Sequence, residues 1–175
     1  MPHSSLLANT TTENLVLGEQ LLLWSLRRWA EAVTQEGCPH CAIVEPFALI
    51  KAEAVAEALH QSLLLLMKPG MAVTRLHRPS VAVIAEDESR FLLAAGAAYH
   101  GDPDLAARLL SGGAGSEAAT ALGKALQALG VLLARHGLSL PQRLPPVVRL
   151  ARPVNSAPLS AWAAVDANAG MALVH

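Results

Sequence analysis

The sequence predicts an all-α protein, a compact bundle of about five helices followed by an extended, proline-rich C-terminal arm. Apolar side chains recur at every third or fourth position along much of residues 13–137, which is the period of an α-helix. Hydroxyl, acidic and proline residues begin these segments, and glycines end several of them. Five prolines then fall within residues 141–158, too many for a helix. A chain of 175 residues has the usual length of one domain, so we expect one core.

The first helix is expected to run from Thr12 or Glu13 to Gly37. The threonines before Glu13 offer hydroxyl caps for the first turn. The apolar positions repeat at spacings of seven, four, three and four residues, so the helix is amphipathic. They are Leu15, Leu22, Leu26, Trp29 and Val33. Trp24 widens the apolar stripe, and we therefore expect contacts with more than one neighbouring element.

A second helix is expected over residues 46–68. Pro46 suits the first turn of a helix, where a backbone N–H is not needed, and Pro69-Gly70 ends the segment. Leucine and valine form its apolar stripe, and His60 falls on the opposite face, which we expect to be solvated. Residues 71–85 carry enough β-branched side chains for short strands, but we predict an extended loop there.

Three shorter helices are expected over residues 86–101, 102–110 and 116–137. The first begins with three acidic residues, the second with an aspartate cap and a first-turn proline, and the third with a serine cap. Three glycines lie inside helical patterns, each costing up to ~1 kcal/mol relative to alanine. Close packing between helices is the expected compensation at these positions, which are Gly96, Gly123 and Gly130.

We therefore divide the chain into a flexible N-terminus (residues 1–12), a helical domain (residues 13–137) and a C-terminal arm (residues 138–175). The arm keeps large apolar side chains, including Leu144 and Trp162, and is more apolar than a typical disordered tail. We expect the arm to pack on the helical body or on a partner subunit.

The composition leaves few charged residues to cover the surface. Hydrophobic residues make up 53% of the chain and charged residues 15%, against a norm of roughly 25% charged. Because monomers rarely expose large apolar patches, we expect a homodimer and a further protein partner. The 13 basic and 14 acidic residues are mixed along the chain, which argues against nucleic-acid binding.

The uninterrupted apolar stretches are far shorter than the ~18–20 residues that cross a bilayer, and residues 1–13 lack the pattern of a signal peptide. We therefore expect a cytoplasmic protein, bacterial in style, with no membrane partner and no cofactor. In that reducing compartment the two cysteines rest as thiols unless they act in redox chemistry or bind metal.

One short motif carries chemistry, Cys38-Pro39-His40-Cys41. A Cys-x-x-Cys pair at a helix start brings two thiols within bonding range, and the free amides of the first turn stabilise the first thiolate. The nine residues from Cys38 to Pro46 resemble the active-site turn of the thioredoxin superfamily, especially its DsbA-like thiol oxidases. The resemblance implies that Cys38 is the attacking thiolate, Cys41 is the resolving thiol, and the positive charge of His40 stabilises the thiolate.

The surroundings of the motif differ from that family, in which the turn follows a buried β-strand, whereas Cys38 follows an amphipathic helix. The motif is also similar to that of AhpD-type thiol peroxidases, all-helical proteins with Cys-x-x-Cys at a helix start. In those proteins a histidine lies four residues beyond the second cysteine. Glu45 takes that place here, so the histidine of the AhpD proton relay is missing.

Two other interpretations of the motif stay open. A zinc site needs four ligands, so His60 and His77 would have to complete Cys38 and Cys41, although they share no short ligand spacing. Alternatively, the cysteines are structural, two small side chains buried under the first helix at a turn between helices. We favour this structural interpretation and predict no catalytic residue and no metal ligand.

The sequence alone therefore favours a non-enzymatic helical protein-interaction or regulatory module that acts as a homo-oligomer. The alternative is a thiol–disulfide oxidoreductase that uses Cys38, Cys41 and His40. A small zinc-binding protein with the same cysteines is the third possibility.

Overall fold

The computed structural model describes residues 7, 10–71, 73, 75–111 and 116–143, and this part of the chain holds six α-helices and no β-strand. The predicted all-α fold is confirmed. A short 3-10 helix, Thr12–Asn14, precedes the first α-helix. The helices are α1 (Leu17–Thr34), α2 (Cys41–Leu49), α3 (Glu53–Leu66), α4 (Glu86–Tyr99), α5 (Pro103–Leu110) and α6 (Glu117–Arg135).

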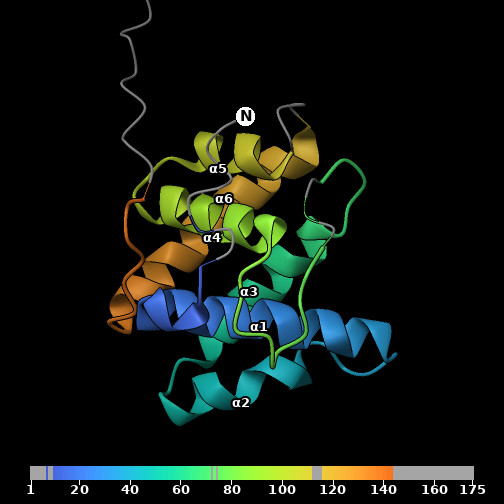
Figure 1. The fold of residues 1–175 in the computed structure, drawn as a ribbon. Coiled ribbons are helices and arrows are strands. Elements are labelled where there is room, and N and C mark those ends of the chain that lie inside the picture. Colours follow the sequence, from blue (N-terminus) through green and yellow to red (C-terminus); the bar gives the residue numbers. More distant parts are fainter. Residues whose placement is uncertain (1–6, 8–9, 72, 74, 112–115, 144–175) are drawn as a thin grey trace, which may run out of the picture. The chain divides into compact units, whose positions relative to one another are not determined.

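Helix α6 lies at the centre of the helix contacts, since it packs against α3, α4 and α5. Helix α1 contacts α4 on one side and α2 on the other, and α2 also contacts α3 (Figure 1). The predicted caps of α5 and α6 are present. The Asp102 carboxylate accepts a hydrogen bond from the backbone N–H of Leu105 at 3.0 Å, and the Ser116 hydroxyl accepts one from the N–H of Ala119 at 3.1 Å.

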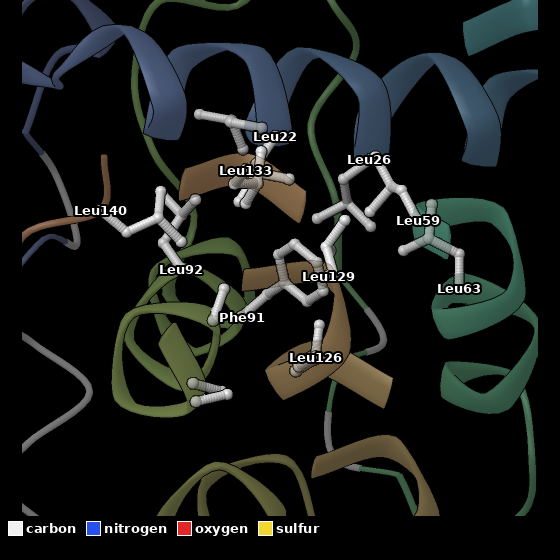
Figure 2. Close-up of a cluster of buried hydrophobic side chains, with 14 of the residues drawn as sticks. Leu22, Leu26, Leu59, Leu63, Phe91, Leu92, Leu126, Leu129, Leu133 and Leu140 are labelled. Carbon is white, nitrogen blue, oxygen red and sulfur yellow. The ribbon is translucent and has the colours of Figure 1, made fainter. Parts of the chain in front are cut away.

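The core is formed by leucines from four helices around a buried aromatic ring. Figure 2 shows side chains from α1, α3, α4 and α6 converging around Phe91, which is fully buried. These are the positions that recur every three or four residues in the sequence, so burial follows the helical period. The cluster includes Leu22, Leu26, Leu59, Leu63, Leu92, Leu126, Leu129 and Leu133.

Helix α6 is the one described helix that is long and apolar enough to cross a membrane by length and composition. In this structure its apolar stripe packs against three other helices, with Leu122, Leu126 and Leu129 buried. A core helix of this kind passes the same test of length and composition.

The single helix expected over residues 46–68 is two helices, and that prediction was wrong. Helix α2 begins five residues before Pro46, at Cys41, so the proline lies inside the helix rather than at its start. Helix α3 begins only at Glu53. The chain bends between the two at Lys51, whose φ of 56° lies in the left-handed region that cannot continue a helix.

The close helix packing predicted at the helical glycines is confirmed at Gly123 and Gly130, whereas Gly96 packs against the non-helical segment after α6. A Cβ at Gly130 would lie 2.9 Å from the Cα of Tyr99 on α4, and a Cβ at Gly123 would overlap the carbonyl oxygen of Pro103 on α5. A Cβ at Gly96 would lie 3.0 Å from the carbonyl oxygen of Pro141. Each glycine therefore allows another backbone to approach its helix closely.

The described residues of 71–85 form an extended loop, as predicted, with one isolated antiparallel bridge between Thr11 and Val83. The loop is held to the helices by a buried ion pair. The Arg27 guanidinium on α1 donates to Glu88 on α4 and to the carbonyl oxygens of Val81 and Val83.

The described residues before and after the helical domain also contact it. Within residues 1–12, which we expected to be flexible, Leu7 is buried and the backbone N–H of Thr12 donates to Ala82 at 2.8 Å. Of the predicted arm, the structure describes residues 138–143; residues 144–175 lie outside the described part. In this described portion Leu138 and Leu140 are buried, and Arg143 donates two hydrogen bonds of 2.7 Å to Glu19 on α1.

Candidate redox site

The cysteine motif forms an exposed turn between α1 and α2, and Cys38 and Cys41 are joined by a disulfide bond. Our prediction that both side chains are buried under the first helix was therefore wrong. The reason is the orientation of α2, which buries Ile43 and Phe47 against the body. Cys41 precedes Ile43 by two residues, about 200° around the helix, and so faces away from the core.

The two sulfur atoms have different surroundings. The backbone N–H of Cys41 donates to Cys38 Sγ at 3.2 Å, and the N–H of Ala42 donates to the Cys38 carbonyl oxygen at 3.1 Å. Cys41 is the first residue of α2, so its N–H is one of the amides that the helix leaves unpaired. When the bond is reduced, this donor and the positive end of the helix dipole favour a thiolate on Cys38.

His40, between the two cysteines, is linked to α3. Its Nε2 lies 3.2 Å from Oε2 of Glu57, an ion pair when the ring is protonated. The other carboxylate oxygen of Glu57 accepts a hydrogen bond of 2.9 Å from the amide of Gln61, one turn further along α3. The turn is thus anchored to α3 by a polar contact of the residue between the two cysteines.

His60 is half-buried, whereas we predicted a fully solvated position. It follows the fully buried Ala56 by four residues and lies at the edge of the core stripe of α3. Its Nδ1 accepts a hydrogen bond of 2.9 Å from the indole N–H of Trp29 on α1. Its ring meets the ring of His40 edge-on, with 5.2 Å between the centroids. Burial lowers the pKa of His60, the charge of His40 lowers it further, and Glu57 acts in the opposite direction.

The residues of the zinc hypothesis are not brought together. The two cysteines are bonded to each other. His77 belongs to the loop before α4, where its backbone N–H donates to Glu88 at 2.8 Å. Within the residues that the structure describes, no three histidine, cysteine, aspartate or glutamate side chains are grouped so as to hold a metal ion.

A polar hollow of about 470 Å³ lies along α1, on the side that faces the loop before α4. Its lining includes Thr34 and Gln35 from the end of α1 and His77 and Arg78 from the loop. The cysteine turn does not line this hollow. A molecule that reacts with the disulfide would therefore meet it at the exposed turn rather than through this hollow.

Sequence reasoning found the two cysteines and His40, and it offered His60 only as a zinc ligand, but it missed Glu57 and Trp29 as neighbours of the motif. Glu57 and His60 lie one turn apart on α3, a spacing that places them on one face of a helix. Nothing in the sequence shows that this face meets the cysteine turn, because the contact depends on how α2 turns back onto α3.

Compared with known proteins, the chain matches no family model, no curated protein and no solved structure. Its function is therefore argued from its own residues.

Proposed function

We propose that this protein carries out thiol–disulfide exchange through Cys38 and Cys41. The observation that supports the proposal most is the exposed disulfide at the start of α2, in which a backbone N–H donates to Cys38 Sγ. A disulfide that only stabilised the fold would gain nothing from exposure, whereas an exchanging one must be reached by a second sulfur. In the cytoplasm, where we expect this protein, disulfides are usually transient and catalytic or redox-sensing.

The proposed reaction is a pair of sulfur displacements. In the reduced protein the Cys38 thiolate attacks a substrate disulfide, a mixed disulfide forms, and the first substrate thiolate leaves. The Cys41 thiolate then attacks Cys38, which releases the second substrate thiolate and closes the Cys38–Cys41 bond. The protein dithiol loses two electrons and two protons, and the substrate disulfide becomes two thiols. The reverse sequence oxidises a substrate dithiol.

Cys38 is the attacking residue in this scheme because the Cys41 N–H already points at its sulfur. His40 lies within the turn, and its positive charge, when present, further favours the thiolate. His40 therefore has the role that the thioredoxin resemblance assigns to it, although the surrounding fold consists of helices.

Equilibration with glutathione tests the proposal. The full chain is incubated in buffers of defined ratio of reduced to oxidised glutathione, quenched with acid and alkylated, and the oxidised fraction is read by mass spectrometry. We expect the oxidised fraction of wild type to show one sharp transition as the glutathione ratio changes. Cys41→Ser should accumulate a glutathione adduct on Cys38, and a variant in which both Cys38 and Cys41 are replaced by serine should form no adduct. A Cys38 that ionises at or above the free-thiol value of about 8.5 and forms no adduct would refute the proposal.

A second candidate function, association with another protein or with a second copy, is supported by large apolar side chains that remain exposed. The most exposed are Leu49 at 81%, Leu17 at 68% and Met67 at 60%. Light scattering of the purified chain at tens of micromolar tests self-association. A measured mass of one chain at every concentration would refute the proposed homodimer. The glutathione experiment tests the redox function independently of this result.

A further inference from the structure

Behind the cysteine turn, four side chains from three segments form a continuous series of contacts, which we call the histidine network. It runs from Trp29 on α1 to His60 on α3, then to His40 in the turn, and ends at Glu57 on α3. The indole end is buried, with Trp29 only 4% exposed, and the carboxylate end is 56% exposed. The network therefore joins the protein interior to the exposed redox site.

The hydrogen bond from Trp29 decides which nitrogen of His60 carries hydrogen. An indole N–H can only donate, so Nδ1 of His60 presents its lone pair, and the ring hydrogen lies on Nε2. A protonated imidazole has hydrogen on both nitrogens. Protonating His60 would therefore break its bond with Trp29 and, when His40 is also protonated, place two positive rings in edge-on contact.

His40 has the opposite surroundings. Its Nε2 faces a carboxylate oxygen of Glu57, and the two form an ion pair when both ring nitrogens of His40 carry hydrogen. Gln61 occupies the other oxygen of Glu57, which leaves Oε2 directed at His40. The titratable groups of α3 in contact with His40 are thus Glu57 and His60, and Trp29 on α1 is linked to His40 through His60.

On the basis of the thiol–disulfide exchange proposed above, we infer that Glu57 is a positioning residue for the Cys38–Cys41 couple, holding on His40 the positive charge that stabilises the Cys38 thiolate. His60 assists by remaining neutral. A stabilised thiolate favours the reduced protein, so the network makes the disulfide a stronger oxidant of substrate thiols. It also ties the redox properties of an exposed turn to helix α3, which contributes no reacting atom.

The inference is tested by the direction in which removing a glutamate charge shifts the pH at which Cys38 ionises. Glu57→Gln and Glu45→Gln each remove one exposed carboxylate near the turn, and Glu45 lies one helical turn beyond Cys41 on α2. Loss of a nearby negative charge by itself stabilises a thiolate and lowers the pH at which Cys38 ionises. If Glu57 acts through His40, its removal has the reverse effect, because the thiolate loses a cation.

The measurement uses the reduced full chain and the pH dependence of alkylation at Cys38 by iodoacetamide, with the modified residue identified by mass spectrometry. We expect Glu57→Gln to raise the ionisation midpoint by about 0.3–0.7 pH units, the two- to fivefold effect of an exposed ion pair. Glu45→Gln should leave the midpoint unchanged or lower it. The equilibrium constant with glutathione should shift toward the oxidised protein by the same two- to fivefold in Glu57→Gln, about 10–20 mV for a two-electron couple.

A His40→Gln background separates the network from a general effect on folding. There Glu57→Gln should no longer raise the midpoint, because the charge through which it acts is gone. A midpoint that falls or stays unchanged in Glu57→Gln would overturn the inference. The proposed function would still stand if wild-type Cys38 ionised below about 8.5 and Cys41→Ser formed the glutathione adduct. Absence of the adduct in Cys41→Ser would refute both.

Discussion

The Arg27 guanidinium on α1 and the Glu88 carboxylate on α4 form a bidentate ion pair, and their side chains are only 2% and 0% exposed. The two hydrogen bonds measure 2.8 and 2.7 Å. Glu88 also accepts from the backbone N–H groups of His77 and Ala85, each at 2.8 Å, and Arg27 donates to two carbonyl groups of the same loop. One buried pair thus joins α1, α4 and the loop before α4.

Glu88→Gln should destabilise the fold strongly. The substitution leaves the Arg27 charge buried without its carboxylate, which costs about 3–5 kcal/mol in comparable buried pairs. Urea denaturation followed by circular dichroism measures the loss. The matched control is Glu86→Gln on the same helix, where the carboxylate is 63% exposed and the expected change is within about 1 kcal/mol. Equal losses in the two variants would contradict the assigned role.

The same ion pair should make the free energy of unfolding depend on pH in the acidic range. Burial by itself would raise the pKa of Glu88, but the hydrogen bonds from Arg27, Ala85 and His77 outweigh it, and the pKa lies below the usual 4.5. A carboxyl with a lowered pKa in the folded state stabilises the protein above about pH 4.5 and loses that contribution as the pH falls. The free energy of unfolding of wild type should therefore approach that of Glu88→Gln below this pH. A constant difference from pH 7 to pH 3 would contradict this expectation.

Trp29→Phe should change the titration of His60. In wild type the pKa of His60 lies below 6.5, mainly because of burial, so its neutral form stabilises the fold at neutral pH and this contribution declines as the pH falls. Phenylalanine removes the N–H that holds Nδ1 of His60 unprotonated, and we expect the His60 ring to titrate at higher pH. Nitrogen-15 NMR of the imidazole rings reports both the titration and the Nε2–H tautomer in wild type. Hydrogen on Nδ1 at neutral pH would be inconsistent with the contact to Trp29.

Reduction of the disulfide should leave the fold intact. The bond joins residues only 3 positions apart, so it closes a very short loop, and the chain-entropy account limits its contribution to about 2 kcal/mol. Both cysteines are exposed, and none of the core side chains depends on the bond. Far-ultraviolet circular dichroism with and without dithiothreitol should overlay, and the urea midpoint should fall only slightly. Unfolding upon reduction would indicate a structural disulfide.

Gly123→Ala should destabilise the protein even though alanine favours helices. A Cβ at this position overlaps the carbonyl oxygen of Pro103, which belongs to the backbone and cannot rotate away. Overpacking of this kind typically costs about 1–3 kcal/mol, more than the ~1 kcal/mol that the better helix propensity returns. Thermal unfolding provides the measurement. Unchanged or increased stability would show that α5 and α6 can separate slightly at low cost.

Much of the helical fold follows from local rules that are readable along the chain. The leucine spacings, the Asp102 and Ser116 caps and the glycines Gly123 and Gly130 each predicted a feature that the structure contains. The boundary between α2 and α3 was missed because Lys51 adopts a left-handed conformation. Glycine and asparagine are the residues that usually take this conformation, so a lysine gave no sign of it in the sequence. Pro46 then gave a misleading signal, since a helix can include proline beyond its first turn when one lost hydrogen bond is tolerated.

The candidate site, like the fold, has features that the sequence determined and others that only the tertiary structure decided. The sequence by itself determined the cysteine spacing, the intervening histidine and the position of the motif next to an amphipathic helix, because these are properties of neighbouring residues. Only the tertiary structure decided that the cysteines face outward and that His40 meets Glu57 and His60. Helical period specifies which face of each helix is apolar, but it does not specify the angle at which a short helix turns back onto the next one. That angle is set by packing, and here it brings an ionisable surface of α3 to the cysteine turn.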